Sequence, residues 1–146
     1  MRIEVDQSGK IEDLRQDTIV AFSNETQFSV SLSRNLKRDI FKEFRKKIKH
    51  LKYKLFAICI FYTIKDYISD CDLIIIDKEY EGKEAFIKGP LISLMRDKFE
   101  NFNKKQVRFS LIGRGSKAHY VAYRVKRKID NPNKLLIKKE IIRYLK

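Results

Sequence analysis

Residues 71–77 read CDLIIID, a short run of branched apolar residues with acidic residues close to both ends. This composition is typical of a strand in the centre of a sheet. The preceding apolar run, residues 55–64 (LFAICIFYTI), is followed by Lys65 and Asp66. Its length favours a mostly buried helix over residues 53–69 and is too short to span a bilayer.

The first 33 residues alternate between apolar and polar positions with a period of two. In residues 1–6, Ile3 and Val5 are separated by charged side chains, and residues 17–23 and 27–33 continue the pattern. Polar turns that contain Gly, Ser, Asn and Thr separate these runs. Three strands joined in this way predict an antiparallel meander.

After the meander, the spacing of apolar residues changes to three or four. Leu36, Ile40, Phe44 and Ile48 follow this spacing, and lysines and arginines lie between them. The pattern predicts an amphipathic helix with a strongly basic outer face.

Helices and strands are expected to alternate beyond the central strand. Helical spacing over residues 82–102 is interrupted by Gly89-Pro90, which predicts a kink or the start of a new helix. A fifth strand follows at 106–112, and then a helix over 117–128 with Ser116 as its N-cap. The whole is expected to form one domain with a meander (1–33), a helical part (34–69), a β-α-β-α part (70–128) and a C-terminal basic helix (134–146).

The charge of the chain is large and unevenly distributed. The formal net charge is +14. Residues 33–54 hold ten basic and two acidic side chains, and residues 103–146 hold fourteen and two, so the positive excess lies in these two blocks. Concentrated positive charge favours binding to a polyanion such as DNA or RNA. A general abundance of lysine is the alternative, but it would spread the charge more evenly.

The cysteines and the start of the chain indicate a cellular compartment. Cys59 and Cys71 are the two cysteines, and their spacing fits neither a disulfide framework nor a zinc site. The chain carries charge from its second residue, unlike a signal peptide. We therefore expect a cytoplasmic protein with buried, reduced thiols. Its basic helices lack bulky Trp or Phe on their polar faces, so we do not expect membrane binding.

Two short motifs end in acidic residues at the expected ends of strands. They are VDQSG at residues 5–9 and IIDKE at residues 75–79. With the order of the expected elements, they resemble the ribonuclease H-like fold of ribonucleases H, Holliday-junction resolvases, transposases and Argonaute nuclease domains. The resemblance covers residues 1–128. It implies an α/β fold with a five-stranded mixed sheet, three antiparallel strands followed by alternating helices and strands, and flanking helices.

The resemblance also implies a site for Mg²⁺ or Mn²⁺. In this fold the first and fourth strands are adjacent, so Asp6 and Asp77 would converge and Glu79 would join them as a catalytic metal ligand. Glu81 or Glu84 is a further candidate. Two such ions about 4 Å apart clamp the attacking and leaving oxygens of a phosphodiester. The alternative is that Asp6 caps a turn and the other acids form a solvated loop.

The sequence departs from the family pattern in its last core helix. Catalytic members usually carry a further carboxylate at the start of this helix, but here no acid occurs between residue 113 and Asp130. The acid that many members have in the first helix is available only as Asp39 or Glu43. Either His119 completes the site, by binding metal or moving a proton near neutral pH, or the nuclease activity is lost. A purely structural role for His119 is the alternative.

The turn at residues 113–117 (GRGSK) predicts a phosphate contact. Backbone N–H groups at a helix N-terminus, next to arginine and lysine, bind anions well. Tyr120 and Tyr123 on the following helix could stack on bases or pack on the sheet. The residues expected to contact nucleic acid are Arg114, Ser116, Lys117, Arg124, Lys128, Lys42, Arg45 and Lys46.

Three functions remain open at this stage. The first is a metal-dependent nuclease or resolvase, and the second is a non-catalytic DNA- or RNA-binding module on the same fold. The third is a structural or toxin-like domain whose charge is incidental. By analogy with resolvases, a homodimer is also possible.

Overall fold

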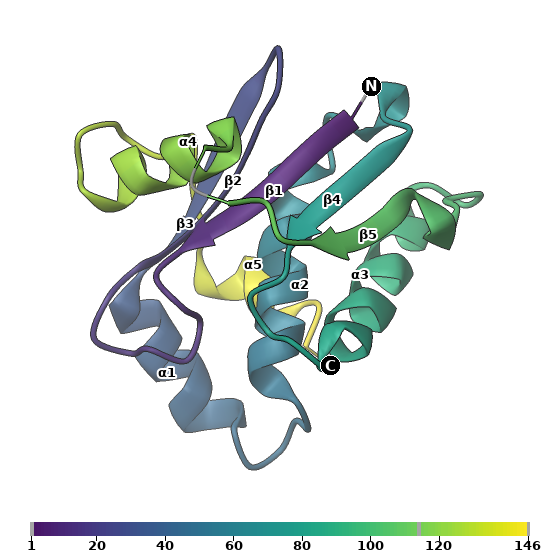
Figure 1. Cartoon of the computed structure of the whole chain (residues 1–146). Helices are drawn as coiled ribbons and strands as arrows, with labels where there is room; N and C mark the ends of the chain where they lie inside the picture. The colour runs from purple at the N-terminus through teal and green to yellow at the C-terminus, as the bar shows by residue number, and fades with distance from the viewer. Residues whose placement is uncertain (1, 114, 146) are drawn as a thin grey trace.

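The computed structural model describes residues 2–113 and 115–145, which form a mixed six-stranded sheet with helices on both faces (Figure 1). The strand order is β5-β4-β1-β2-β3-β6. The first three strands pair antiparallel, whereas β4 pairs parallel with β1 and with β5, and β6 pairs parallel with β3. The strands are β1 (Arg2–Ser8), β2 (Thr18–Ser23), β3 (Gln27–Leu32), β4 (Leu73–Asp77), β5 (Val107–Ser110) and β6 (Lys134–Leu135).

The helices divide between the two faces of the sheet. Helix α2 packs against β2, β3 and α3 on one face, and α4 packs against β1, β2 and β3 on the other. Within the described residues, no helix is both long and apolar enough to cross a membrane. The helices are α1 (Arg34–Phe44), α2 (Leu51–Ile64), α3 (Glu84–Lys98), α4 (Lys117–Lys126) and α5 (Lys138–Ile142), with short 3-10 turns η1 (Ile68–Asp70) and η2 (Lys104–Gln106).

Each face of the sheet has its own apolar core. The larger core holds Ile3 and Val5 of β1 and Ile74 and Ile76 of β4, all fully buried beside α2 and α3. The smaller core lies between β2 and α4. Because successive side chains of a strand point to opposite faces, Asp6 faces α4 rather than the larger core.

Four strands end at the same edge of the sheet. Because β1, β4 and β5 are parallel, and two antiparallel pairings return β3 to the direction of β1, the carboxyl ends of all four lie together. We call this the carboxyl edge. Helix α1 follows β3 directly, so the first basic block of the sequence begins there.

Most expected elements are confirmed, and the C-terminal part is corrected. Residues 53–69 are helical over most of their length, as α2. The predicted C-terminal helix over 134–146 is wrong at its start, because residues 134–135 form a sixth strand and α5 begins only at Lys138. The open edge of β3 explains this difference, since the Ser29 carbonyl accepts from the Asn133 N–H and the Ser31 carbonyl from the Leu136 N–H.

Helix α3 passes through Gly89-Pro90 without a break. A proline inside a helix lacks one N–H donor and crowds the preceding turn. The restart of the helix that the sequence suggested does not occur, since α3 is assigned without interruption from Glu84 to Lys98. Its buried residues on both sides of Pro90, which include Ile87 and Leu91, pack into the larger core and hold the helix together.

The connection between β1 and β2 is held by a buried lysine. Lys37 of α1 is 0% exposed, and its Nζ donates to the carbonyls of Lys10 (3.2 Å) and Asp13 (2.7 Å) and to Thr18 Oγ1 (2.9 Å). Burial lowers the pKa of Lys37 to about 8, partly offset by the charge of Asp13. Gly9 begins the same connection with φ +82, and a side chain there would meet the Asp17 carbonyl.

We expect Lys37→Met to lower the free energy of unfolding by about 2 kcal/mol, because methionine fills the space but leaves three acceptors without their donor. Urea denaturation followed by circular dichroism measures the change. Lys42→Met is the matched control, since Lys42 is exposed on the same helix and its loss should change stability by less than about 0.5 kcal/mol. Equal effects of the two substitutions would contradict a fixing role for Lys37.

Candidate functional site

Three carboxylates meet at the carboxyl edge. Asp6, Asp77 and Glu79 each present a ligand oxygen within 4.8 Å of the others, and we call them the acidic triad. The sheet register brings them together, because Val5 lies opposite Ile76 and the next residue on each strand is an aspartate. Glu79 follows β4 in a turn in which its N–H donates to the Asp77 carbonyl at 2.9 Å.

Hydrogen bonds from β1, from α4 and from the segment after β5 orient the two aspartates. Asp6 is 3% exposed, and its Oδ1 accepts from the Gln7 N–H at 2.8 Å. Its Oδ2 lies 2.9 Å from Nδ1 of His119 on α4. Asp77 Oδ1 accepts from the Ile112 N–H at 2.9 Å. The structure therefore brings together all four residues that the sequence suggested as catalytic.

Burial and the charges of neighbouring carboxylates raise the pKa values of two triad members, Asp6 and Glu79. Burial raises the pKa of Asp6 to about 6, and the nearby Asp77 adds to this while the hydrogen bond with His119 opposes it. Burial, and then the charges of Asp77 and Asp6, raise the pKa of Glu79 to about 7, and Lys10 offsets a part. Asp6 and Glu79 therefore hold their protons to a higher pH than isolated carboxyl groups do.

This arrangement fits a hard divalent cation. Carboxylate oxygens are the ligands that Mg²⁺ and Mn²⁺ prefer. A bound cation would also offset the electrostatic repulsion between the carboxylates of Asp6, Asp77 and Glu79.

A tyrosine next to the triad holds the surrounding loops together, and no motif in the sequence points to this role. The Tyr80 hydroxyl accepts from Gln7 Nε2 and from the Ile11 N–H, both at 3.2 Å, and donates to Glu12 Oε1 at 3.0 Å. It therefore connects the turn that carries Glu79 with β1 and with the β1–β2 connection. Gln7 Oε1 is a buried side-chain oxygen for which the described structure offers no hydrogen-bond partner.

Other acids that the sequence suggested lie outside the triad. Asp39 and Glu43 of α1 both contact Lys138 Nζ, at 3.0 and 3.3 Å, so they join α1 to the C-terminal segment. Glu84 accepts from the Lys83 N–H at the start of α3, and Glu81 is exposed. None of these four residues belongs to the triad.

The N-terminus of α4 is capped as expected. Ser116 Oγ accepts from the Ala118 N–H at 3.1 Å and donates to Glu4 Oε1 at 3.4 Å. Lys117 is exposed at the first position of the helix. Arg114, which the sequence suggested as a phosphate contact, lies outside the described residues.

The two further basic residues suggested near α4 have different surroundings. Arg124 is held by Asp130 at 2.8 Å and donates to the Tyr120 hydroxyl at 3.2 Å. Lys128 is exposed, with φ +60, and lies beyond the end of the helix at Lys126. The predicted helix over 117–128 is thus two residues shorter.

A basic hollow of about 420 Å³ lies along α1. Within the described parts of the chain, none of its lysines and arginines has a carboxylate within ion-pair distance. Its one acid, Glu43, is already engaged by Lys138. The hollow contains the three expected residues, of which Lys42 is on α1 and Arg45 and Lys46 are in the turn after it, and two more basic ones. Its basic residues are Arg38, Lys42, Arg45, Lys46 and Lys47, beside Leu14 and Phe41.

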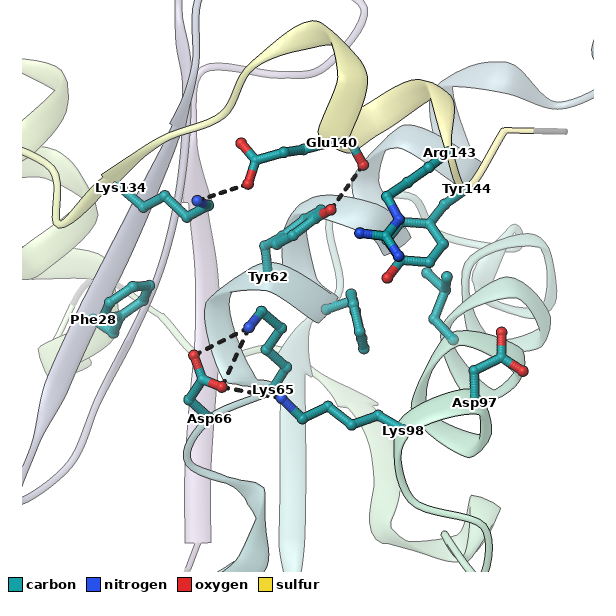
Figure 2. A pocket seen from close by; sticks show the side chains of 12 residues that line it. Phe28, Tyr62, Lys65, Asp66, Asp97, Lys98, Lys134, Glu140, Arg143 and Tyr144 are labelled. Carbon is teal, nitrogen blue, oxygen red and sulfur yellow. Dashed lines mark hydrogen bonds and ion pairs between the residues drawn. The ribbon is translucent and has the colours of Figure 1, made fainter.

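A larger hollow, of about 710 Å³, lies away from the triad between α2, α3 and α5 (Figure 2). Its lysines are already paired with acids. Asp66 holds Lys65 and Lys98 at 3.2 and 3.1 Å, and Glu140 holds Lys134 at 2.7 Å. These ion pairs reduce the positive charge that the hollow offers to an anion.

The fold and the site together define the chain as an α/β protein with an acidic site at one end of its sheet. Three carboxylates at the carboxyl edge of the mixed sheet meet a histidine from α4, and a separate basic hollow lies along α1. No family model, curated protein or solved structure matches this chain. Its function therefore has to be argued from this geometry.

Proposed function

We propose that this chain is a metal-dependent nuclease of the ribonuclease H-like type, which hydrolyses phosphodiester bonds in DNA or RNA. The acidic triad carries the proposal. Three acids gathered in a chain of net charge +14 do not help to bind a polyanion, but they are required to hold a cation.

The arrangement of the strands supports the assignment. Strand β1 lies between β2 and β4, and the acids come from adjacent β1 and β4, as the resemblance implies. In many α/β sheets, functional groups gather beyond the carboxyl ends of the strands. The triad occupies this position.

Each residue of the site would have a defined task. Mg²⁺ or Mn²⁺ bound by the triad would supply Lewis-acid stabilisation of the phosphoryl oxygens and an activated water. The N–H groups of Gln7 and Ile112 each hold one oxygen of Asp6 and Asp77, which orients both carboxylates toward the site. His119 reaches Asp6 from the last core helix and is 35% exposed, so it can also exchange a proton with substrate or solvent.

A specific observation favours a second function, that of a non-catalytic binding module. Helix α4 presents a histidine to the triad in place of the carboxylate that catalytic members usually carry. The unpaired basic residues of the hollow do not depend on metal and would bind a phosphate backbone in either case.

Cleavage of labelled nucleic acids distinguishes the two functions. Single strands, duplexes, RNA–DNA hybrids and four-way junctions are incubated with Mn²⁺, Mg²⁺ or EDTA, and the products are separated by size. We expect cutting of at least one substrate with metal and none with EDTA. His119→Ala should reduce the rate about a hundredfold if the histidine moves a proton.

Salt-sensitive binding without cutting would favour the binding module. If no nucleic acid binds at physiological salt, both functions are wrong.

A further inference from the structure

Two exposed tyrosines lie on the outer surface of α4. Tyr120 is 58% exposed and Tyr123 is 42% exposed, although α4 has buried apolar residues along its sheet-facing side. A guanidinium lies near each ring, with Arg124 Cζ 5.5 Å from the centre of Tyr120 and Arg127 Cζ 5.7 Å from the centre of Tyr123. Exposed tyrosine next to arginine suits a nucleobase, which stacks on a flat ring and carries a phosphate.

The two tyrosines lie at different positions around the helix. One residue of an α-helix advances by about 100°, so residues four apart lie almost above one another. His119, Tyr123 and Arg127 therefore form a row along one side of α4. The Arg127 N–H still bonds to the Tyr123 carbonyl at 2.9 Å, so the helical geometry extends to the end of this row.

This row begins at the acidic triad. His119 Nδ1 lies 2.9 Å from Asp6 Oδ2, so the first member of the row touches a triad residue. Tyr123 follows one helical turn later, and side chains one turn apart are neighbours, with roughly 5–6 Å between their Cβ atoms. Tyr120 and Arg124, in contrast, lie about 100° or more around the helix from His119.

The two arginines also differ in what they already bind. Asp130 contacts Arg124 through two nitrogens, Nε at 2.8 Å and Nη2 at 3.3 Å. Arg127 is exposed, and the described part of the chain places no carboxylate within ion-pair distance of it. Arg127 is thus free to hold a phosphate, whereas Arg124 is not.

We propose that Tyr123 and Arg127 hold the nucleic-acid strand that enters the acidic triad, with an unpaired base stacked on Tyr123 and the adjoining phosphate on Arg127. The preferred partner is therefore a single strand, or a duplex with unpaired nucleotides next to the bond at the triad. A paired base is covered on both faces by its neighbours and cannot stack on a side chain. This inference rests on the proposed nucleic-acid function.

The chain contains no tryptophan, which allows a direct test. We expect a tryptophan introduced by Tyr123→Trp to be quenched when oligo-dT or oligo-rU of 15 nucleotides is added in EDTA. A 15-base-pair duplex should quench it little. Tyr120→Trp is the matched control on the same helix and should respond to neither.

Affinities from fluorescence anisotropy complete the test. Tyr123→Leu should weaken single-strand binding about tenfold, the usual effect of losing one stacked base, while Tyr123→Phe keeps the ring and the affinity. Tyr120→Leu should change single-strand affinity less than twofold. The two oligonucleotides also show whether the site prefers DNA or RNA.

Equal losses from Tyr123→Leu and Tyr120→Leu would overturn the inference, as would a wild type that binds duplex more tightly than single strand. Either result leaves the proposed function standing, because nucleic acid is still bound. If wild type binds none of the three probes, the inference and the proposed function fail together.

Discussion

Asp6→Asn is expected to abolish metal-dependent cleavage and, at the same time, to stabilise the metal-free protein. The loss of cleavage should be on the order of a thousandfold, because a catalytic metal ion contributes several kcal/mol to the stabilisation of the transition state. Asparagine keeps the size of the side chain and one oxygen for the Gln7 N–H. It removes the charge that a cation needs.

The gain in stability follows from the raised pKa of Asp6. The carboxyl has a pKa of about 6 in the folded state and 3.8 as an isolated group, so the folded protein holds its proton to higher pH than the unfolded chain does. Stability therefore falls as pH rises from about 4 to about 6, and the full cost is present above that range. Asp6→Asn removes this cost, which is roughly 3 kcal/mol at pH 8.

Thermal unfolding in EDTA at pH 5 and pH 8 measures this effect. The melting temperature of Asp6→Asn should exceed that of wild type at pH 8, and the difference should be about half as large in free energy at pH 5. Added Mn²⁺ should raise the melting temperature of wild type but not that of the variant, since only the native triad binds it.

Glu4→Gln is the matched control for Asp6→Asn. Glu4 lies two residues earlier on the same face of β1 and loses the same charge, but it is outside the triad. It should retain cleavage and the response to Mn²⁺. A destabilised Asp6→Asn that still cuts would show that Asp6 only caps a turn, the alternative that the sequence left open.

The local pattern of the sequence was sufficient to predict five of the six strands, whereas the meeting of Asp6 and Asp77 was expected from the resemblance to the ribonuclease H-like fold. Alternation over the first strand fixes Asp6 on the face opposite Val5, and the register of two parallel strands then brings Asp77 beside it. The first step depends on short-range periodicity, whereas the second depends on the adjacency of β1 and β4, which the resemblance implied and periodicity alone does not. The same reasoning placed His119 on the helix that crosses this face.

Contacts between distant segments could not be predicted in the same way. The pairing of residues 134–135 with β3 depends on an open strand edge that only the folded sheet presents. The roles of Lys37 and Tyr80 depend on loops that come together after folding, and neither residue stands in a recognisable motif. Asp39 and Glu43 were candidate acids for the site because the sequence does not show their partner, Lys138, which is almost a hundred residues away.

The second large expected effect is a loss of nucleic-acid binding when charges in the basic hollow along α1 are reversed. Helix α1 follows β3, whose carboxyl end lies at the same edge of the sheet as the triad, and the hollow lies along the second half of this helix and the turn after it (Figure 1). Each phosphate contact releases about one counterion, and binding falls steeply with salt. Arg45→Glu combined with Lys46→Glu removes two contacts and adds two repulsive charges, and we expect it to weaken nucleic-acid binding on the order of a hundredfold at 0.1 M salt.

Lys104→Glu combined with Lys105→Glu separates a local contact from a general attraction. Each of the two double variants lowers the net charge of +14 by four units. The exposed Lys104 and Lys105 precede β5, however, and so lie at the end of the sheet opposite the triad. Affinity is measured by fluorescence anisotropy over a series of salt concentrations. The α1 variant should lose about two units from the slope of log affinity against log salt, whereas the control keeps the slope of wild type. Equal losses in the two variants would mean that the whole charge of the protein attracts nucleic acid and that α1 makes no specific contact with it.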